Sequence, residues 1–296
     1  MDISGRFFEK KYKVCENAPK EVEWEKYYSE IMEEYKKLLE NYSDSEKVFQ
    51  EFFEKNPSFV PGALGMGGGL SGHYPHMDTL ISQPEIGIAV KRKPDFLWLA
   101  QDSVDFTPVF IEIERPNKSM FTKEKIPNKD FNQALNQLDE WRGILNGGVN
   151  IQAFYQNFSI PLSMQQKNFK PRFVLIYGRR NEYENDEYLQ KIRSSKQRED
   201  VWIMSFDRLL AIFEYKQFTS CRVSQGKYEI LHIPPTFRYR ADRISELVKY
   251  EGFEDAIDRM EMTSAERKKF LHDRFPYWKN RAEIIYKGMI ASQEGE

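Results

Sequence analysis

The chain has only two cysteines in 296 residues, Cys15 and Cys221. Neither lies in a Cys-x-x-Cys motif or beside a histidine, whereas zinc sites and disulfide frameworks need several such residues at close spacing. The sequence therefore argues against a structural zinc site and against a disulfide-stapled fold. It predicts two ordinary thiols in the reducing environment of the cytoplasm.

Long hydrophobic runs are also missing. Residues 1–6 include Asp2 and Arg6, and no apolar segment follows them. A secretory signal would have such a segment. No later stretch approaches the roughly 20 apolar residues that a membrane-spanning helix needs. We expect a cytoplasmic protein with no membrane partner.

A strong net charge of either sign is absent, since the formal charge is -2 at pH 7. This argues against a protein that coats nucleic acid by bulk electrostatics. Basic residues nevertheless gather in two short segments: Lys91, Arg92 and Lys93, and then Arg115, Lys118, Lys123, Lys125 and Lys129. Such clusters form either a rim that draws phosphates toward a metal site or a solvated charged face, and both interpretations stay open.

A phosphate-binding glycine motif is missing as well. Residues 62–72 are rich in glycine but lack the GK[ST] ending of a P-loop and the strand and helix around a dinucleotide site. We expect a linker or a loop near a substrate channel. His73 and His76 follow without further ligands at metal-site spacing, so we expect them to be incidental.

Apolar residues recur at alternating spacings of four and three between residues 21 and 42. They are Trp24, Tyr28, Ile31, Tyr35, Leu38 and Tyr42. This seam predicts a helix that either makes a coiled-coil-like contact with a second chain or lies across its own domain. A second helix is expected to begin after Ser45 and to end at Asn56-Pro57, because proline disfavours helix in the residue before it.

The remaining pattern predicts strands and helices in alternation. Strands are expected at 86–90, 93–99, 107–113, 172–178 and 201–206, and helices at 131–145 and 186–196. Asp207 is expected to cap a further short helix. A small hairpin around Gly226 and two or three amphipathic helices in 242–289 complete the chain.

Three carboxylates lie on the two strands 93–99 and 107–113. Glu112 and Glu114 share one face of their strand, and Asp95 is expected opposite them. A buried carboxylate is costly unless it is paired or bound to a cation, so the row predicts a site for Mg²⁺ or Mn²⁺. A water bound to such an ion is the usual nucleophile for phosphodiester hydrolysis. The alternative is a network of ion pairs with Arg92, Lys93 or Arg115.

The order of these elements resembles the PD-(D/E)XK nuclease superfamily, whose signature is Asp-x(n)-Glu-x-Lys. Three further segments resemble the Shedu anti-phage defence nucleases. They are the opening from Glu46 to Asn56-Pro57, the strand Ile111-Glu112-Ile113-Glu114-Arg115-Pro116, and the helix with Gln133-Ala134-Leu135, Gln137-Leu138 and Trp141. The resemblance covers about residues 45–215.

The resemblance implies an α/β fold with a PD-(D/E)XK restriction-endonuclease-like core, that is, a mixed central sheet flanked by helices. The core would span residues 45–215, with an N-terminal helical segment at 1–44 and a mainly helical C-terminal extension at 216–296. The resemblance also implies an oligomeric assembly, so we expect a homo-oligomer.

The resemblance further implies roles for individual residues. Asp95 and Glu112 would be metal ligands, and Gln137 a polar residue that faces the site from a helix. Glu46 would support the site from the first helix, with Gln133 beside Gln137. Glu114 departs from the pattern, because it holds the position of the usual lysine. A glutamate there would accept the proton of the attacking water or ligate a second metal ion.

The function expected from these residues is a metal-dependent DNA endonuclease or nickase of anti-phage defence, with Asp95, Glu112, Glu114 and Gln137 as catalytic residues. Its cofactor would be Mg²⁺ or Mn²⁺, and its partner phage or plasmid DNA. DNA contacts are assigned to the basic residues near the acids: Lys91, Arg92, Lys93, Arg115 and Lys118. The alternative is a catalytically weak nuclease-fold protein that binds DNA ends or assembles complexes.

Overall fold

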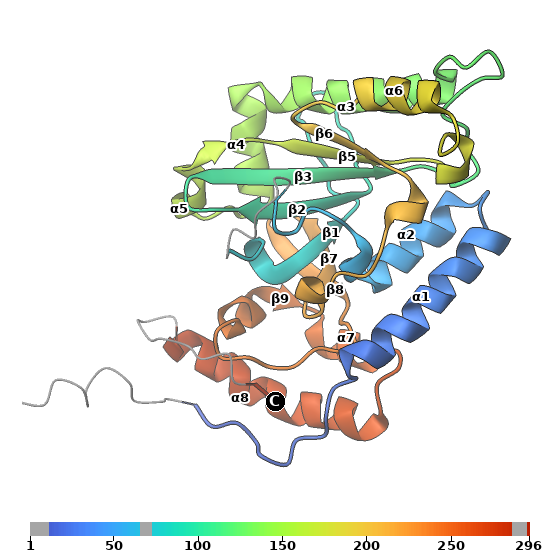
Figure 1. The fold of residues 1–296 in the computed structure, drawn as a ribbon. Coiled ribbons are helices and arrows are strands. Elements are labelled where there is room, and N and C mark those ends of the chain that lie inside the picture. The colour runs from blue at the N-terminus through green and yellow to red at the C-terminus, as the bar shows by residue number, and fades with distance from the viewer. Residues whose placement is uncertain (1–11, 66–72, 286–294) are drawn as a thin grey trace, which may run out of the picture.

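A computed structural model describes residues 12–65, 73–285 and 295–296 of the chain. Its centre is a nine-stranded mixed sheet with helices on both faces (Figure 1), which confirms the mixed α/β architecture. The strand order is β6-β5-β3-β2-β1-β7-β8-β9, and β4 pairs with β3. The strands are β1 Thr79–Ser82, β2 Phe96–Gln101, β3 Asp105–Ile113, β4 Asn168–Phe169, β5 Arg172–Ile176, β6 Val201–Met204, β7 Thr219–Ser224, β8 Lys227–His232 and β9 Tyr250–Glu251.

One edge of this sheet collects the ends of four neighbouring strands. β2 runs antiparallel to β3 with Phe96 opposite Ile111, so the start of β2 lies beside the end of β3. β3, β5 and β6 are parallel, with Ile113 opposite Ile176 and Ile176 opposite Met204. The carboxyl ends of three strands and the amino end of β2 therefore meet at the same edge, which we call the strand-end edge.

Two N-terminal helices cover one face of the sheet: α1 Trp24–Asn41 and α2 Glu46–Lys55. From α1, Tyr27, Ile31, Tyr35 and Leu39 are buried in the same apolar cluster as Phe49 of α2 and the strand residues of that face. The expectation that the first helix lies across its own domain is thus confirmed. Its buried stripe is centred on Tyr27, Ile31, Tyr35 and Leu39, while Tyr42, expected in the seam, is exposed.

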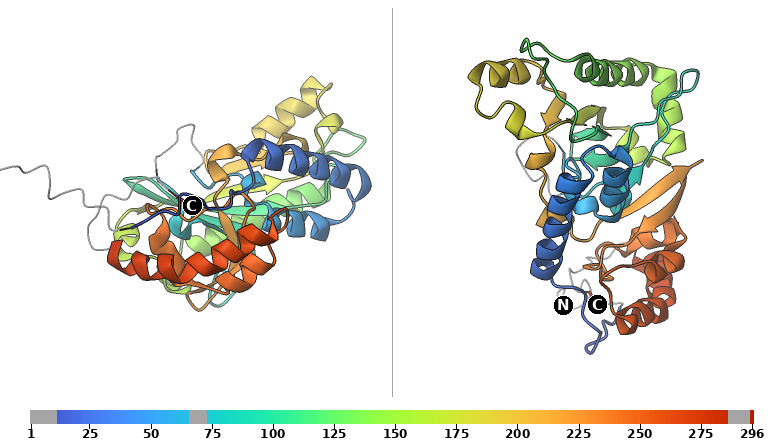
Figure 2. Two further views of the ribbon diagram at one scale, coloured as in Figure 1. Left: turned by 90° about the horizontal axis from the view of Figure 1, so that it is seen from below. Right: turned by 90° about the vertical axis from the view of Figure 1, so that its right-hand side faces the viewer.

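The opposite face is covered by helices from the middle and the end of the chain (Figure 1). They are α3 Lys129–Leu145, α4 Gly148–Asn157, α5 Leu162–Gln165, α6 Glu187–Ser195, α7 Phe253–Asp258 and α8 Ala265–Ile285. Figure 2 shows α8 at the other end of the molecule from α3 and α6. The helices expected at 131–145 and 186–196 are confirmed as α3 and α6.

The segment after residue 215 extends the same sheet. β7 and β8 form the hairpin expected around Gly226, which has a φ of 77°, and β7 pairs in parallel with β1. The helices expected in 242–289 are present as α7 and α8, preceded by a 3-10 turn at Ile244–Lys249.

Two expectations about secondary structure are wrong. Residues 86–90 form no strand, because only Ile86 pairs, in an isolated bridge with Arg92, and Gly87 has a φ of 83°. The strand beside β2 is instead β1. After Asp207 there is no α-helix but two 3-10 turns, Phe206–Arg208 and Phe213–Tyr215.

Part of the glycine-rich segment 62–72, residues 66–72, lies outside the described residues. Across the described part of the chain, every helix is too short or too polar to cross a bilayer.

Candidate active site

Asp95 lies at the strand-end edge, in the residue before β2. Its Oδ2 accepts a hydrogen bond of 2.8 Å from the backbone N–H of Ile113, the last residue of β3. Its backbone carbonyl accepts a hydrogen bond of 2.7 Å from the N–H of Gln83. Hydrogen bonds therefore fix both the side chain and the backbone of Asp95, and the carboxyl group is held beside the end of β3.

Glu112 projects from β3 toward α3. Its Oε1 accepts a hydrogen bond of 2.7 Å from Nε2 of Gln137, so the sequence expectation that Gln137 faces the acids is met in geometry. The other carboxyl oxygen, Oε2, is buried, and no N–H or hydroxyl group of the described residues donates to it. A buried polar atom without such a donor is costly, which makes this oxygen available to a ligand.

Asp95 and Glu112 influence each other's ionisation. Burial, together with the charges of Glu46 and Glu114, raises the pKa of Asp95 to about 7, although the hydrogen bonds with the N–H of Ile113 and with Glu112 oppose the shift. Burial, the carboxylates of Asp95 and Glu114, and the hydrogen bond with Asp95 raise the pKa of Glu112. The main cause is the burial of two adjacent acids, and a cation between them would favour the ionised form of both.

The donor set of this pair suits a hard divalent cation. Mg²⁺ is commonly bound by one or two carboxylates and completes its shell with waters and substrate phosphates. No cluster of three or more His, Cys, Asp or Glu side chains with metal-site geometry occurs in the described ranges. Asp95, Glu112 and Glu114 thus form no three-carboxylate cluster there, and a cation at this place would rest on Asp95 and Glu112.

Glu114 is paired with a lysine. Its Oε2 lies 2.5 Å from Nζ of Lys118, and the two side chains are only 14% and 19% exposed. A turn closed by the hydrogen bond from Lys118 N to the carbonyl of Arg115 brings the lysine back toward the strand. Gly178, at a φ of 61°, leaves room for this turn, because a Cβ there would lie 2.7 Å from the carbonyl oxygen of Lys118.

The lysine pairing differs from both sequence interpretations of the region. The ion-pair alternative named Arg92, Lys93 or Arg115 as partners of the acids, whereas the described partner of Glu114 is Lys118. Lys118 itself was assigned to DNA contacts. Pro116 and Asn117 favour a turn between Glu114 and Lys118. This pair of residues is the sequence signal that the chain folds back and brings Lys118 toward Glu114.

The two supporting residues differ in their distance from the acids. Glu46 is the first residue of α2. Partial burial and the charge of Glu114 raise its pKa, whereas the charges of Lys118 and Arg115 lower it. It is thus an electrostatic neighbour of the site. Gln133 is exposed one turn before Gln137, and the described residues offer its side chain no hydrogen bond.

The expected basic rim is divided between paired and unpaired cations. Lys91 forms an ion pair of 2.6 Å with Glu85, and Arg92 one of 2.8 Å with Glu140. Lys93 and Arg115 are exposed, and neither has an acidic partner within the described residues.

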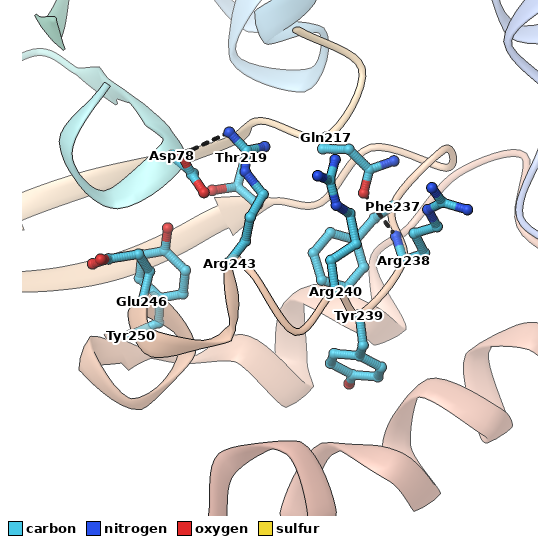
Figure 3. A pocket seen from close by; sticks show the side chains of 10 residues that line it. All are labelled: Asp78, Gln217, Thr219, Phe237, Arg238, Tyr239, Arg240, Arg243, Glu246 and Tyr250. Carbon is cyan, nitrogen blue, oxygen red and sulfur yellow. Dashed lines mark hydrogen bonds and ion pairs between the residues drawn. The ribbon is translucent and has the colours of Figure 1, made fainter. Parts of the chain in front are cut away.

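A cavity lies away from these acids, between Asp78 just before β1, the start of β7 and the segment from Phe237 to Tyr250 (Figure 3). Asp78 and Arg243 form an ion pair of 3.0 Å across it, and the Arg243 guanidinium stacks 3.4 Å from the ring centre of Tyr74. Burial raises the pKa of Asp78 to about 7, although Arg243 opposes the shift. These contacts hold the segment around Arg243 against the residues that precede β1.

The family model described as Shedu protein SduA, C-terminal, matches residues 43–210, which is more than half of the chain and includes all of the acids discussed above. No curated protein matches.

Proposed function

This chain belongs to the Shedu family of anti-phage defence proteins, and we propose that it serves this role as a metal-dependent DNA endonuclease or nickase. The proposed catalytic core is of the PD-(D/E)XK type and occupies residues 45–215, between a helical N-terminal segment at 1–44 and a C-terminal extension at 216–296. Support for this core comes from the mixed sheet and from the placement of Asp95 and Glu112 at adjacent strand ends.

The observation that carries the proposal is the juxtaposition of two buried acids, Asp95 and Glu112, with an Oε2 atom of Glu112 to which no N–H or hydroxyl group of the described residues donates. These two residues would hold Mg²⁺ or Mn²⁺. When bound, such an ion supplies a Lewis acid for the scissile phosphate and lowers the pKa of a water that attacks it.

The protein side chains around the pair have their own tasks in this proposal. Gln137 fixes the rotation of the Glu112 carboxyl group through Oε1, which leaves Oε2 directed away from the amide. Lys118 holds a positive charge against Glu114 and so limits the negative charge at the position where the superfamily pattern has lysine. An ammonium group from four residues later in the chain thereby lies within ion-pair distance of the side chain at this position.

Cleavage of plasmid DNA tests the proposal. Purified protein should nick or cut supercoiled DNA in Mg²⁺ or Mn²⁺ and lose this activity in EDTA, and linear DNA should serve as a second substrate. Glu112→Ala should abolish the activity. Equal cleavage by the wild-type protein and Glu112→Ala would contradict the proposal, because the activity would then come from another site or from a contaminant.

A second candidate is a nuclease-fold protein that binds DNA or DNA ends without cutting. Glu114 favours it, because the usual lysine is missing from the strand. Its signature is salt-sensitive DNA binding that survives Glu112→Ala, with no turnover in any divalent metal. The family resemblance also supports a homo-oligomer, which light scattering after size-exclusion chromatography tests.

A further inference from the structure

Four exposed cations lie beyond the strand-end edge, one for each strand that ends there. Lys93 precedes β2, Arg115 follows β3, Arg180 follows β5 and Arg208 follows β6, and all four residues are exposed. The sheet order β6-β5-β3-β2 places them in sequence along the edge. We call these four residues the strand-end row. Lys93 and Arg115 were expected near the acids. The positions of Arg180 and Arg208 follow only from the order of the strands in the sheet.

Short contacts hold the loops of the row together. The N–H of Phe206 donates to the carbonyl of Gly178 at 3.1 Å, and the N–H of Arg180 donates to Oδ2 of Asp207 at 2.6 Å. The loops after β5 and β6 therefore lie side by side. The loop after β3 joins them, because Gly178 packs against the carbonyl of Lys118.

Several acids near the row are already engaged, although the charge of Arg115 also acts on Glu46. Asp207 forms an ion pair of 2.7 Å with Arg179, and Asp186 one of 2.6 Å with Lys125. Glu182 accepts hydrogen bonds from the backbone N–H groups of residues 120 and 121. Glu184 is an exposed acid close by in sequence, but in the described residues no ion pair joins an acid to any member of the row. The positive charge of the row is thus free to attract an anion.

The dimensions of the row suit a nucleic-acid backbone. Neighbouring strands are about 4.8 Å apart, so four adjacent strands spread their ends over roughly 14 Å. Duplex DNA advances about 3.4 Å along its axis for each phosphate of one strand, so a row of this length lies beside roughly four base pairs of a duplex. Arginine in particular binds phosphate oxygens through a planar fork of N–H groups.

We propose that the strand-end row binds consecutive phosphates of one strand of duplex DNA and thereby lays the DNA across the Asp95–Glu112 site. The identification of the polyanion as DNA rests on the proposed function. The new element is the path, which runs from Lys93 and Arg115 over the loops after β5 and β6 to Arg180 and Arg208.

Binding measured without cleavage tests this path. Fluorescence anisotropy with a labelled duplex of about 30 base pairs is recorded in EDTA at several salt concentrations, for the full chain and for Arg180→Gln/Arg208→Gln. Each lost phosphate contact should reduce the slope of log K against log salt by about 0.9, so the double variant should lose about two. Its affinity at about 0.1 M salt should fall roughly tenfold or more.

The matched control removes two exposed cations elsewhere, Arg222 on β7 and Lys269 on α8. Arg222→Gln/Lys269→Gln should keep the wild-type slope, and Arg180→Lys/Arg208→Lys should keep most of it because the charges remain. An unchanged slope in Arg180→Gln/Arg208→Gln, an equal loss in the control, or no binding by the wild-type chain would each overturn the proposed path.

The same experiment separates the path from the catalytic proposal. Binding that depends on Arg180 and Arg208, in a protein that never cuts DNA in Mg²⁺ or Mn²⁺, supports the path and contradicts the nuclease. Metal-dependent cutting with binding that ignores both arginines supports the nuclease and contradicts the path.

Discussion

Lys118 places its ammonium nitrogen 2.5 Å from Oε2 of Glu114, in a pair whose side chains are largely buried. Glu114 stands two residues after Glu112, where the superfamily pattern has lysine. Lys118 therefore neutralises the negative charge that Glu114 places near Glu112. Exchanging the two side chains asks whether the charge or its position in the sequence matters.

Lys118→Met should leave Glu114 as an unpaired acid beside Glu112 and lower plasmid cleavage by about a hundredfold, the scale typical of a lost proton-transfer or charge partner. The exchange variant Glu114→Lys/Lys118→Glu keeps the pair and should recover most of the activity. Single-turnover nicking in Mn²⁺ measures both. A Lys118→Met enzyme as active as wild type, or an exchange variant as inactive as Lys118→Met, would contradict this role.

Gln137 and Gln133 provide a matched pair on α3. Gln137→Leu removes the 2.7 Å hydrogen bond to Glu112 and should reduce cleavage about tenfold or more, because the carboxyl group loses its orientation. Gln133→Leu changes an exposed side chain and should leave cleavage unchanged. Parallel thermal melts show whether either variant loses stability. Equal cleavage by the two variants would show that Gln137 does not position Glu112.

The proximity of Asp95, Glu112 and Gln137 was predictable from the sequence. Strand alternation and the hairpin expected between the two strands place Asp95 opposite the strand that carries Glu112, and these local patterns depend on residues close in sequence. The position of Gln137 beside the acids was expected from the family resemblance.

The rest of the site depends on contacts between distant segments. Residues 86–90 look like a strand but bend at Gly87, and the strand beside β2 is β1, a run of only four residues. Arg180 and Arg208 follow separate strands and become neighbours of Arg115 only because β3, β5 and β6 are parallel and adjacent. No local periodicity encodes that adjacency.

Gly178 controls the position of Lys118. Gly178→Ala would place a Cβ 2.7 Å from the carbonyl oxygen of Lys118 at a φ of 61°, so the 115–118 turn must shift. We expect a loss of stability of about 2 kcal/mol or more and a loss of cleavage. Gly65→Ala also has a positive φ, of 86°, but no atom of the described residues lies within 4 Å of its added Cβ, so it should cost about 1 kcal/mol and leave cleavage intact. Urea denaturation and plasmid nicking compare the two; retained cleavage in Gly178→Ala would show that the Lys118 turn tolerates displacement.

Asp78 gives the folded chain a pH-dependent stability that is independent of the acids at the strand-end edge. Burial raises its pKa from the ordinary 3.8 to about 7, so between these values the folded state binds a proton that the unfolded state has released. The free energy of unfolding must therefore fall as pH rises through this window. Asp78→Asn removes the titration, and asparagine tolerates the φ of 48° found at this position.

Relative to Asp78→Asn, the wild-type chain should lose about 2.7 kcal/mol of stability between pH 5 and pH 8, as roughly two pH units of the window are crossed at about 1.36 kcal/mol each. Urea denaturation at both pH values measures the difference, and Asp273→Asn, at an exposed site on α8, controls for the loss of a carboxylate. Parallel pH profiles of the wild-type chain and Asp78→Asn would mean that Arg243 already holds Asp78 ionised at pH 5. The ion pair in the cavity of Figure 3 would then be permanent across the range.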